Sequence, residues 1–528
     1  MFAAASQRSS SGVVNRTSSD AGASAMRAQI PPELQREQDR IEQIAREMGL
    51  TFFRVVFEMV DWKQMNALAA YGGFPTRYPH WRWGMEYAEL SKSYEYGLHK
   101  IYEMVINNDP TYAYLLQGNA MVDQKLVMAH VYGHADFFLN NVYYSHTNRK
   151  MIDAMANHAT RVRRHMERHG VEPVERFLDA TLSVEDLIDP GAVFRARPRQ
   201  DATPKDVPEP RDVGRLPSKP YLDRYVNPPA YIEERRQAMT AAREEAKRNP
   251  PSPERDVLGF VLTQAPLDPW ERDVLELVRD ESYYFLPQRQ TKVMNEGWAS
   301  YWHTHMMTTR VLNDSELIDY ADHHSGTVAV SPGRLNPYKL GIELFRDIER
   351  RWNMGQFGPE WEACDRMAER LRWDRKLGLG RDKIFEVRRL HSDSTFLDEY
   401  LTQDFCERQG LFISKKNPRT GKEEIESSSF NDVKQAFLFH FANGGRPVIE
   451  VLDANYANRG ELLLVHRHAG VDLRMDWAKE VLENLTRVWK RPVRIETQLG
   501  NKPVRLGHDG EKPIQEDLDQ AALKLKTR

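Results

Sequence analysis

The segment 128–141, MAHVYGHADFFLNN, contains two histidines, His130 and His134, whose spacing suits metal chemistry. Because an α-helix turns once in about 3.6 residues, histidines four apart lie on the same helix face. Helices of zinc hydrolases present two imidazole ligands with this spacing. The surrounding residues are apolar and aromatic, and they would form the dry shell that neutral imidazole ligands need. The segment therefore predicts a metal-binding helix, with two buried structural histidines as the alternative.

A second pair of histidines has the same spacing and offers an internal comparison. His165 and His169 lie in RRHMERH, a polar, arginine-rich stretch without an apolar shell. Such a stretch is typical of a solvated helix face. We therefore assign metal binding to the first pair alone.

The segment 294–305, MNEGWASYWHTH, is predicted to supply the third ligand. Zinc sites with two histidines commonly take a glutamate from a later helix. Glu296 lies among large apolar residues, so its carboxylate is expected to be buried and to need a cation or hydrogen-bond donors. The predicted metal ligands are His130, His134 and Glu296, with zinc as the expected ion and iron or manganese as alternatives. A glutamate paired with an arginine in a helical core is the competing interpretation.

The catalytic base of such a site is not in its usual place. In the H-E-x-x-H motif the residue after the first histidine is the glutamate base, whereas here it is Val131. We predict Glu281 as the base, because the aromatic residues beside it would raise its pKa. His303, seven residues after Glu296 and on the same helix face, is the second candidate for acid–base work.

A polar loop, SPGRLNPYKLG, precedes a further predicted helix and is a candidate for substrate binding. Polar loops beside a packed body often grip a substrate or its carboxylate, although ordinary loop polarity is the alternative. The predicted substrate-binding residues are Arg334, Asn336, Tyr338, Lys339, His324 and His391.

The elements that must position these residues belong to a chain of 528 residues, too long for one ordinary core. Helical periodicity is predicted across 88–107 and 119–145, and an amphipathic helix across 475–490. Alternating β-like runs predict a hairpin shortly before that last helix, and PVRIETQLG predicts a strand after it. The expected divisions are a disordered tail at 1–29, a helical body at 30–410 with a proline-rich excursion at about 184–229, a small α/β module at 411–510, and a tail at 511–528.

Composition narrows the classes of partner. The formal net charge of −3 gives no reason to expect nucleic acid or an anionic membrane. The chain has only two cysteines, Cys364 and Cys406, which build neither a disulfide framework nor a thiolate zinc site. No apolar run approaches the roughly 20 residues of a membrane-spanning helix. We expect a cytoplasmic protein without a membrane span.

Four segments together resemble the SpoVR family, the stage V sporulation protein R group that includes the YcgB-like proteins: HVYGHADFFLNN, TKVMNEGWASYWH, NPYKLGIELFRDIERRW and TFLDEYLTQDF. The resemblance extends from about residue 30 to 510. It implies a bacterial, cytoplasmic protein linked to spore-cortex formation and stationary-phase physiology, with functional links to a PrkA-type serine kinase and a YeaH-type protein. HVYGH combined with NEGWA is also similar to the gluzincin metallopeptidases. The expected fold is a mainly α body with a gluzincin-like metal-site core, plus the small C-terminal α/β module.

Three functions follow as hypotheses. The first is a zinc-dependent amide or peptide hydrolase, or an acyl-transfer enzyme, acting on a cell-wall peptide or its precursor in peptidoglycan metabolism. The second is a non-haem iron oxygenase, because two histidines and one carboxylate also form that facial triad, although such triads usually lie on β-barrels. The third is a non-catalytic metal-binding scaffold or effector of the associated kinase, in which Val131 marks a fold that has lost its base.

Overall fold

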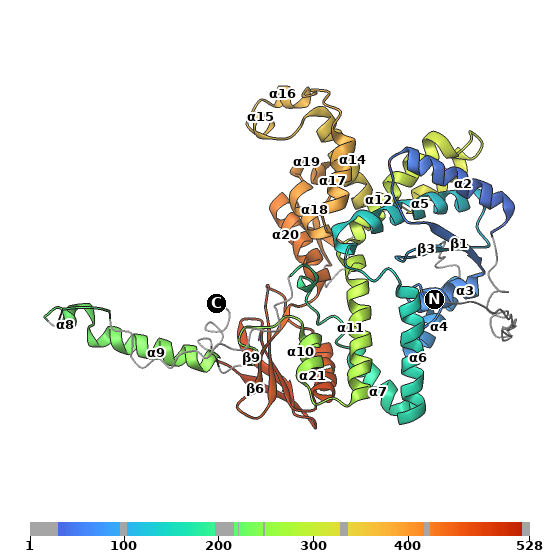
Figure 1. The fold of residues 1–528 in the computed structure, drawn as a ribbon. Helices are drawn as coiled ribbons and strands as arrows, with labels where there is room; N and C mark the ends of the chain where they lie inside the picture. The colour runs from blue at the N-terminus through green and yellow to red at the C-terminus, as the bar shows by residue number, and fades with distance from the viewer. Residues whose placement is uncertain are drawn as a thin grey trace, which may run out of the picture.

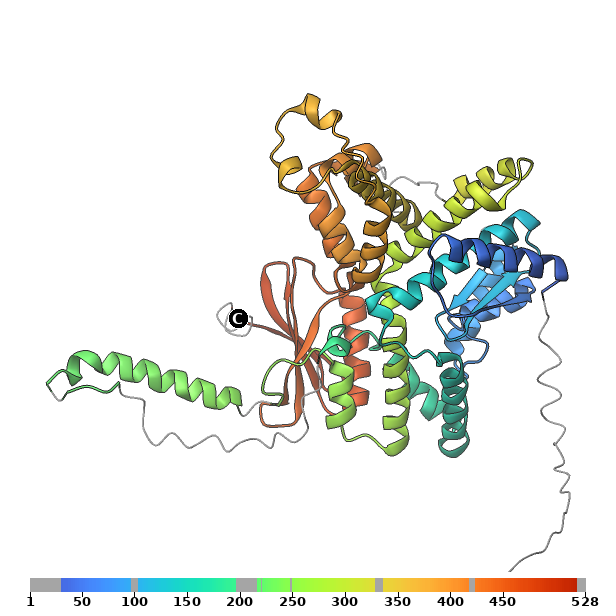
Figure 2. The ribbon, with the colours of Figure 1, turned by 45° about the horizontal axis from the view of Figure 1, so that its top comes forward.

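The computed structural model describes residues 30–95, 103–195, 216–219, 221–246, 249–327, 336–416 and 423–519. Over these residues the chain is mainly helical, with a five-stranded sheet near the C-terminus (Figures 1 and 2). The predicted fold class, a helical body with a small C-terminal α/β module, is confirmed at this level. The predicted tail at 1–29 lies outside the described residues. Among the described helices, none combines the length and apolar character needed to cross a bilayer.

Three helices form the centre of the body: α5 (Met121–Asn140), α12 (Lys292–Met306) and α14 (Pro337–Met354). Helix α5 is buried on nearly all sides, and for that reason its sequence shows no amphipathic stripe. Helix α12 packs between α5 and α14 and makes its most extensive contacts with these two helices. The helix with the two histidines and the helix with Glu296 are therefore direct neighbours.

Glycines allow these helices to approach backbone to backbone. A Cβ atom added at Gly133 of α5 would lie 2.7 Å from the Cα atom of Ala299 in α12. A Cβ atom added at Gly297 of α12 would lie 2.4 Å from the Cα atom of Gly341 in α14. No side chain fits at such distances. The glycine within H-V-Y-G-H and the glycine within N-E-G-W are thus packing residues of the centre.

A small sheet lies beside α5, with strand order β1–β3–β2. Strands β1 (Val55–Val60) and β3 (Thr111–Leu116) are parallel, and β2 (Glu103–Ile106) pairs antiparallel with β3 at one edge. The prediction of helix across 88–107 is wrong at its end, because Glu103–Ile106 form strand β2. A four-residue strand gains its hydrogen bonds only from a neighbouring strand, and local periodicity does not reveal that pairing.

The C-terminal sheet has the order β10–β9–β8–β7–β6 and packs against helix α21 (Met475–Trp489). The predicted hairpin, helix and following strand are confirmed. Two further strands were not predicted, and β10 falls within the expected tail at 511–528. The strands are β6 (Ile449–Tyr456), β7 (Glu461–His466), β8 (Val493–Leu499), β9 (Lys502–His508) and β10 (Pro513–Asp517).

The C-terminal sheet shares its core with the helical body. Val451 of β6 and Leu485 of α21 lie in one hydrophobic cluster with Val174 of α7 and Val274 of α11. The segment that follows residue 411 also packs on the body, since Val433 of α20 joins the cluster that surrounds α5. The five-stranded sheet itself begins at β6, well after the predicted module start at 411. The segments before and after residue 411 bury apolar side chains against each other. The change in sequence pattern at residue 411 therefore does not mark a break in the packing.

One helical arm leaves the body. Helix α9 (Pro229–Ala246), preceded by α8 (Asp223–Val226), projects away from the remaining helices in both views (Figures 1 and 2). The other helices are α2 (Pro32–Glu47), α3 (Trp62–Ala70), α4 (Trp81–Glu95), α6 (Met151–His169), α7 (Val171–Leu182), α10 (Val257–Gln264), α11 (Pro269–Gln290), α13 (Leu317–Thr327), α15 (Pro359–Glu362), α16 (Met367–Leu371), α17 (Gly380–Leu390), α18 (Asp393–Tyr400), α19 (Gln403–Gln409) and α20 (Phe430–Phe441), with a short hairpin of β4 (Ile413–Lys416) and β5 (Glu423–Ser427) before α20.

Candidate metal centre

Helices α5 and α12 bring together His130, His134 and Glu296, which we call the ligand cluster. One potential ligand atom from each residue lies within 4.8 Å of the other two. Oε2 of Glu296 is 3.5 Å from Nε2 of His130 and 3.5 Å from Nε2 of His134. These distances are longer than good hydrogen bonds, and Oε2 is buried without a hydrogen-bond partner among the described residues. Three ligand atoms therefore converge on a point between the two helices.

Each imidazole of the ligand cluster is held through its other ring nitrogen. Nδ1 of His134 lies 2.9 Å from the side-chain oxygen of Asn295. An amide oxygen only accepts hydrogen bonds, so Nδ1 donates and the Nε2 lone pair of the neutral ring faces Glu296. Nδ1 of His130 lies 2.8 Å from Nδ1 of His303, and one of these nitrogens donates to the other. Contacts of this kind fix the ring orientation of metal-binding histidines.

The charge states of the ligand cluster suit a cation. Burial, with a further contribution from His130, lowers the pKa of His134 to about 4, so this imidazole is neutral near pH 7. Burial by itself would raise the pKa of Glu296, but the contacts with both histidines lower it below its ordinary value. A carboxylate and a neutral imidazole lone pair that face each other repel. A divalent ion between them would remove that repulsion, and the two-nitrogen, one-oxygen donor set fits zinc, iron or manganese.

Tyr338, the second residue of α14, contacts the ligand cluster. Its ring stacks over that of His130, with centroids 6.3 Å apart and planes inclined by 27°. Burial and the neighbouring carboxylates of Glu296 and Glu103 raise the pKa of Tyr338. The Tyr338 hydroxyl therefore keeps its proton and remains a hydrogen-bond donor beside the ligand cluster.

Glu103, the first residue of β2, is a further carboxylate at the centre. Burial raises its pKa, and the nearby charges of His130 and Glu296 act on it in opposite directions. Glu103 is therefore near enough to His130 and Glu296 to be affected by their charges, and it belongs to strand β2. Glu103 was not predicted as a site residue, because residue 103 was expected to lie within a helix and no motif surrounds it.

A buried aspartate fixes the start of the helix that carries Glu296. The carboxylate of Asp393 accepts hydrogen bonds from the backbone N–H groups of Val293 and Met294, each at 2.9 Å. These N–H groups belong to the first turn of α12, where a carboxylate also interacts favourably with the helix dipole. Burial nevertheless raises the pKa of Asp393 to about 7. Asp393 therefore holds the N-terminal turn of α12 and, through that turn, the position of Glu296.

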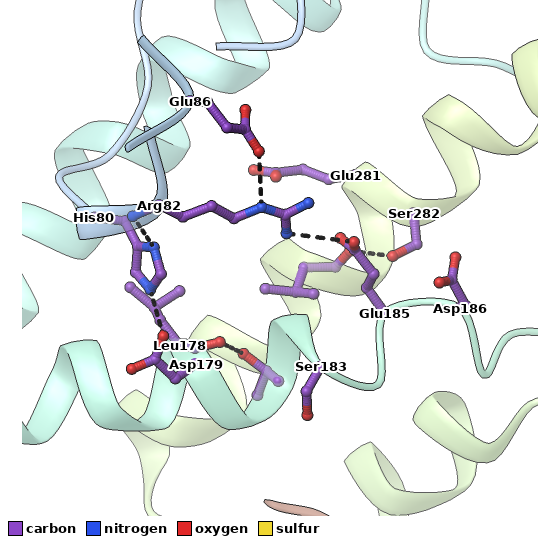
Figure 3. A network of polar contacts seen from close by, with 12 residues as sticks. His80, Arg82, Glu86, Leu178, Asp179, Ser183, Glu185, Asp186, Glu281 and Ser282 are labelled. Atoms are coloured by element: carbon purple, nitrogen blue, oxygen red, sulfur yellow. Dashed lines mark hydrogen bonds and ion pairs between the residues drawn. The ribbon is translucent and has the colours of Figure 1, made fainter. Parts of the chain in front are cut away.

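Glu281, predicted as the base, belongs to a different cluster. Its carboxylate lies 2.7 Å from Nη2 of Arg77, 3.0 Å from Nδ1 of His158 and 3.3 Å from the hydroxyl of Tyr78. All four side chains are buried. Figure 3 shows Glu281 together with the ion pairs that Arg82 forms with Glu86 and Glu185. Glu281 is committed to these partners and is not available as the base of the ligand cluster.

The other predicted site residues are spread over several places. His303 supports His130, as described above. Asn336 caps α14, since its side-chain oxygen accepts from the backbone N–H groups of Tyr338 and Lys339. The ring of His391 lies 3.7 Å from the carboxylate of Glu399 and so faces another part of the body. Arg334 and the side chain of His324 lie outside the described residues.

Comparison with known proteins assigns the chain to a family. Residues 29–446 match the model described as SpoVR like protein, and residues 447–500 match the SpoVR-like C-terminal domain. The chain belongs to the SpoVR family. It is 28% identical to Uncharacterized protein YcgB of Escherichia coli (strain K12) over 485 residues. The aligned region covers 87% of this chain and 90% of YcgB. No solved structure gives a significant match.

The family assignment inferred from the four sequence motifs is confirmed. Within this SpoVR chain the ligand cluster, Glu103 and Tyr338 all lie in the segment that matches the larger model. The C-terminal segment contributes no member of the ligand cluster. Chemically, the centre offers three side chains that could hold a metal ion, a further carboxylate, and a hydroxyl able to donate a hydrogen bond.

Proposed function

We propose that this SpoVR-family chain is a metal-dependent hydrolase of amide bonds, with zinc as the favoured ion. The observation that carries the proposal is the convergence of His130, His134 and Glu296 around a carboxylate oxygen without a hydrogen bond. Three protein ligands leave one position of a tetrahedral ion open, as in catalytic and unlike structural zinc sites. A bound zinc ion would act as a Lewis acid and lower the pKa of water to about 7.

Glu103 takes the role of general base in this proposal. Burial moves its pKa upward, towards the range in which a carboxylate accepts and returns protons efficiently. Glu103 accepts a proton from the attacking water and then gives it to the departing amine. Because the proposed base comes from strand β2, catalysis does not require a glutamate at the position of Val131 in α5.

Two other side chains complete the centre. The Tyr338 hydroxyl, which keeps its proton, donates a hydrogen bond to the carbonyl oxygen as negative charge develops on it. His303 acts through His130, whose ring it holds by the contact between their Nδ1 atoms. His303 is therefore a positioning residue and does not touch the substrate.

A cell-wall peptide or its precursor is the proposed substrate, and it follows from the family assignment and from the amide chemistry. A functional link to a PrkA-type kinase and a YeaH-type protein belongs to the same proposal. The substrate class rests on the family, whereas the reaction class rests on the residues of the centre.

The first test is metal analysis of purified full-length protein by plasma mass spectrometry. We expect a near-stoichiometric transition metal in the wild type and its loss in Glu296→Gln. The His169→Ala variant is the matched control, because His169 belongs to the polar histidine pair and should leave the metal content unchanged. A metal-free wild type, or full metal retention in Glu296→Gln, would contradict the proposal.

The second test separates chemistry from metal binding. Glu103→Gln should retain the metal but lose hydrolysis of muropeptide amides by about 10²-fold or more, because general base catalysis contributes on that scale. Absence of hydrolysis in the metal-loaded wild type would favour the scaffold hypothesis. Iron as the bound metal together with oxygen consumption would favour the oxygenase hypothesis.

A further inference from the structure

A cavity lies between helix α11 and the segment 142–148 that follows α5. Its volume is about 310 Å³, at the lower end of the range for small-molecule sites. None of the three residues of the ligand cluster lines it. The side chains that matter for recognition are Tyr143, His146, His158, Phe194, Asp280 and Tyr283.

One wall of the cavity presents a histidine of fixed orientation. Nδ1 of His158 lies 3.0 Å from Glu281, and the other Glu281 oxygen lies 2.7 Å from the Arg77 guanidinium. With Nδ1 engaged by Glu281, Nε2 is the ring nitrogen of His158 that is left to contact a ligand.

Asp280 adds a carboxylate to the same cavity. Among the residues that the structure describes, Asp280 has neither a salt bridge nor a hydrogen-bond partner, whereas Asp273 on the same helix is paired with Arg161 and His165. Asp280 is exposed on its helix, and the partial desolvation that remains raises its pKa. The cavity therefore combines a carboxylate that forms no salt bridge with a described residue and an imidazole ring of fixed orientation, the first supplied and the second held by α11.

Aromatic rings form another part of the wall. The ring of Phe194 lies 5.6 Å from that of Tyr143 and 5.3 Å from that of His146, centroid to centroid, in edge-on contacts. The Phe194 side chain is 46% exposed, which is unusual for a phenylalanine that flanks a cavity. The electron-rich faces of aromatic rings attract cations and pack against apolar groups.

We propose that this cavity binds an organic ammonium ion, a primary amine carried on a short apolar or aromatic group. The ammonium N–H groups would donate to the Asp280 carboxylate and to Nε2 of His158, while the apolar part packs against Tyr143 and Phe194. A carboxylate ligand is disfavoured because Asp280 would repel it. A neutral alcohol would leave the charge of Asp280 uncompensated. This site does not depend on the ligand cluster or on the proposed hydrolase activity.

The test uses three small probes of similar shape and different charge: benzylamine, benzyl alcohol and benzoate. Each is titrated into full-length protein by isothermal calorimetry at about pH 8, where a free imidazole is neutral and the amine is still charged. We expect saturable binding of benzylamine and no saturable binding of the other two. Asp280→Asn should weaken benzylamine binding by about tenfold or more, the scale of a hydrogen bond between charged groups.

Glu276→Gln is the matched control. Glu276 is an exposed carboxylate one turn earlier on α11 and does not line the cavity, so this variant should bind benzylamine within about twofold of the wild type. Binding should also persist in His130→Ala, which separates this cavity from amine coordination at the metal centre. Equal binding of benzyl alcohol, unchanged binding in Asp280→Asn, or no saturable binding of benzylamine would each overturn the proposal.

Discussion

Acidification of the metal-free protein should destabilise the fold through His134. Burial lowers the pKa of this residue to about 4 in the folded chain, whereas an exposed histidine titrates near 6.5. Between these two pH values the unfolded state binds the proton and the folded state does not. Stability from this group is therefore fully present above about pH 6.5 and is lost as the pH falls towards 4.

The magnitude follows from the shift. A difference of one pKa unit corresponds to about 1.4 kcal/mol, so a histidine that moves from 6.5 to about 4 costs roughly 3 kcal/mol over the whole interval. Bound metal should make the loss steeper, because protons then compete with the ion for the same Nε2 lone pair. In the metal-free protein the slope from His134 alone should not exceed about 1.4 kcal/mol per pH unit.

The assay is urea unfolding of the chelator-treated protein at several pH values between about 4.5 and 7.5, the interval in which His134 titrates on unfolding. Tryptophan fluorescence is a suitable signal, because Trp298 and Trp302 are fully buried in α12 beside the ligand cluster. The His134→Gln variant removes the titrating group, and its pH profile should be flatter than that of the wild type by the amount given above. Parallel profiles for the two proteins would refute the assignment of a buried, neutral His134.

Three further predictions concern packing and positioning. Gly297→Ala should destabilise the protein by about 2 kcal/mol or more and reduce its metal content, because the added Cβ would meet the α14 backbone at 2.4 Å. Calorimetry and metal analysis measure these two effects. Gly84→Ala is the control and should change neither stability nor metal content, because no atom lies within 4 Å of its added Cβ. Asp393→Asn should weaken metal affinity in chelator competition about tenfold or more, since it loosens the start of α12, and unchanged affinity would contradict the positioning role. Glu281→Gln should cost about 3 kcal/mol in urea unfolding by leaving Arg77 buried without its carboxylate, yet leave metal content intact.

The ligand cluster was predictable because each of its features is local or compositional. Four-residue spacing places His130 and His134 on one helix face whatever the tertiary structure, and apolar neighbours predict that both are buried. Glu296 followed from the need of a buried carboxylate for a partner. The glycines Gly133 and Gly297 stand within the same two motifs, and only the packing of α5, α12 and α14 shows why they must be glycines.

The proposed base, Glu103, was not predictable, since its position depends on pairing between distant segments. Glu103 reaches the centre because β2 pairs with β3, and a four-residue strand has too little periodicity to be distinguished from the end of a helix. Glu281 was assigned to the centre from its aromatic neighbours and from its position shortly before Glu296 in the same helical block. The burial of Glu281 was inferred correctly. Its partner Arg77, however, lies 204 residues earlier in the chain, and no local pattern connects the two residues.

Anomalous X-ray scattering from crystals of metal-loaded protein tests the central claim most directly. A metal ion held by the ligand cluster predicts one strong anomalous peak between Nε2 of His130, Nε2 of His134 and Oε2 of Glu296, with ligand distances near 2.0–2.2 Å for zinc. The same peak should be absent from crystals of Glu296→Gln prepared in parallel. Metal-loaded crystals with no peak at this position, or with their strongest peak at another group of residues, would contradict it.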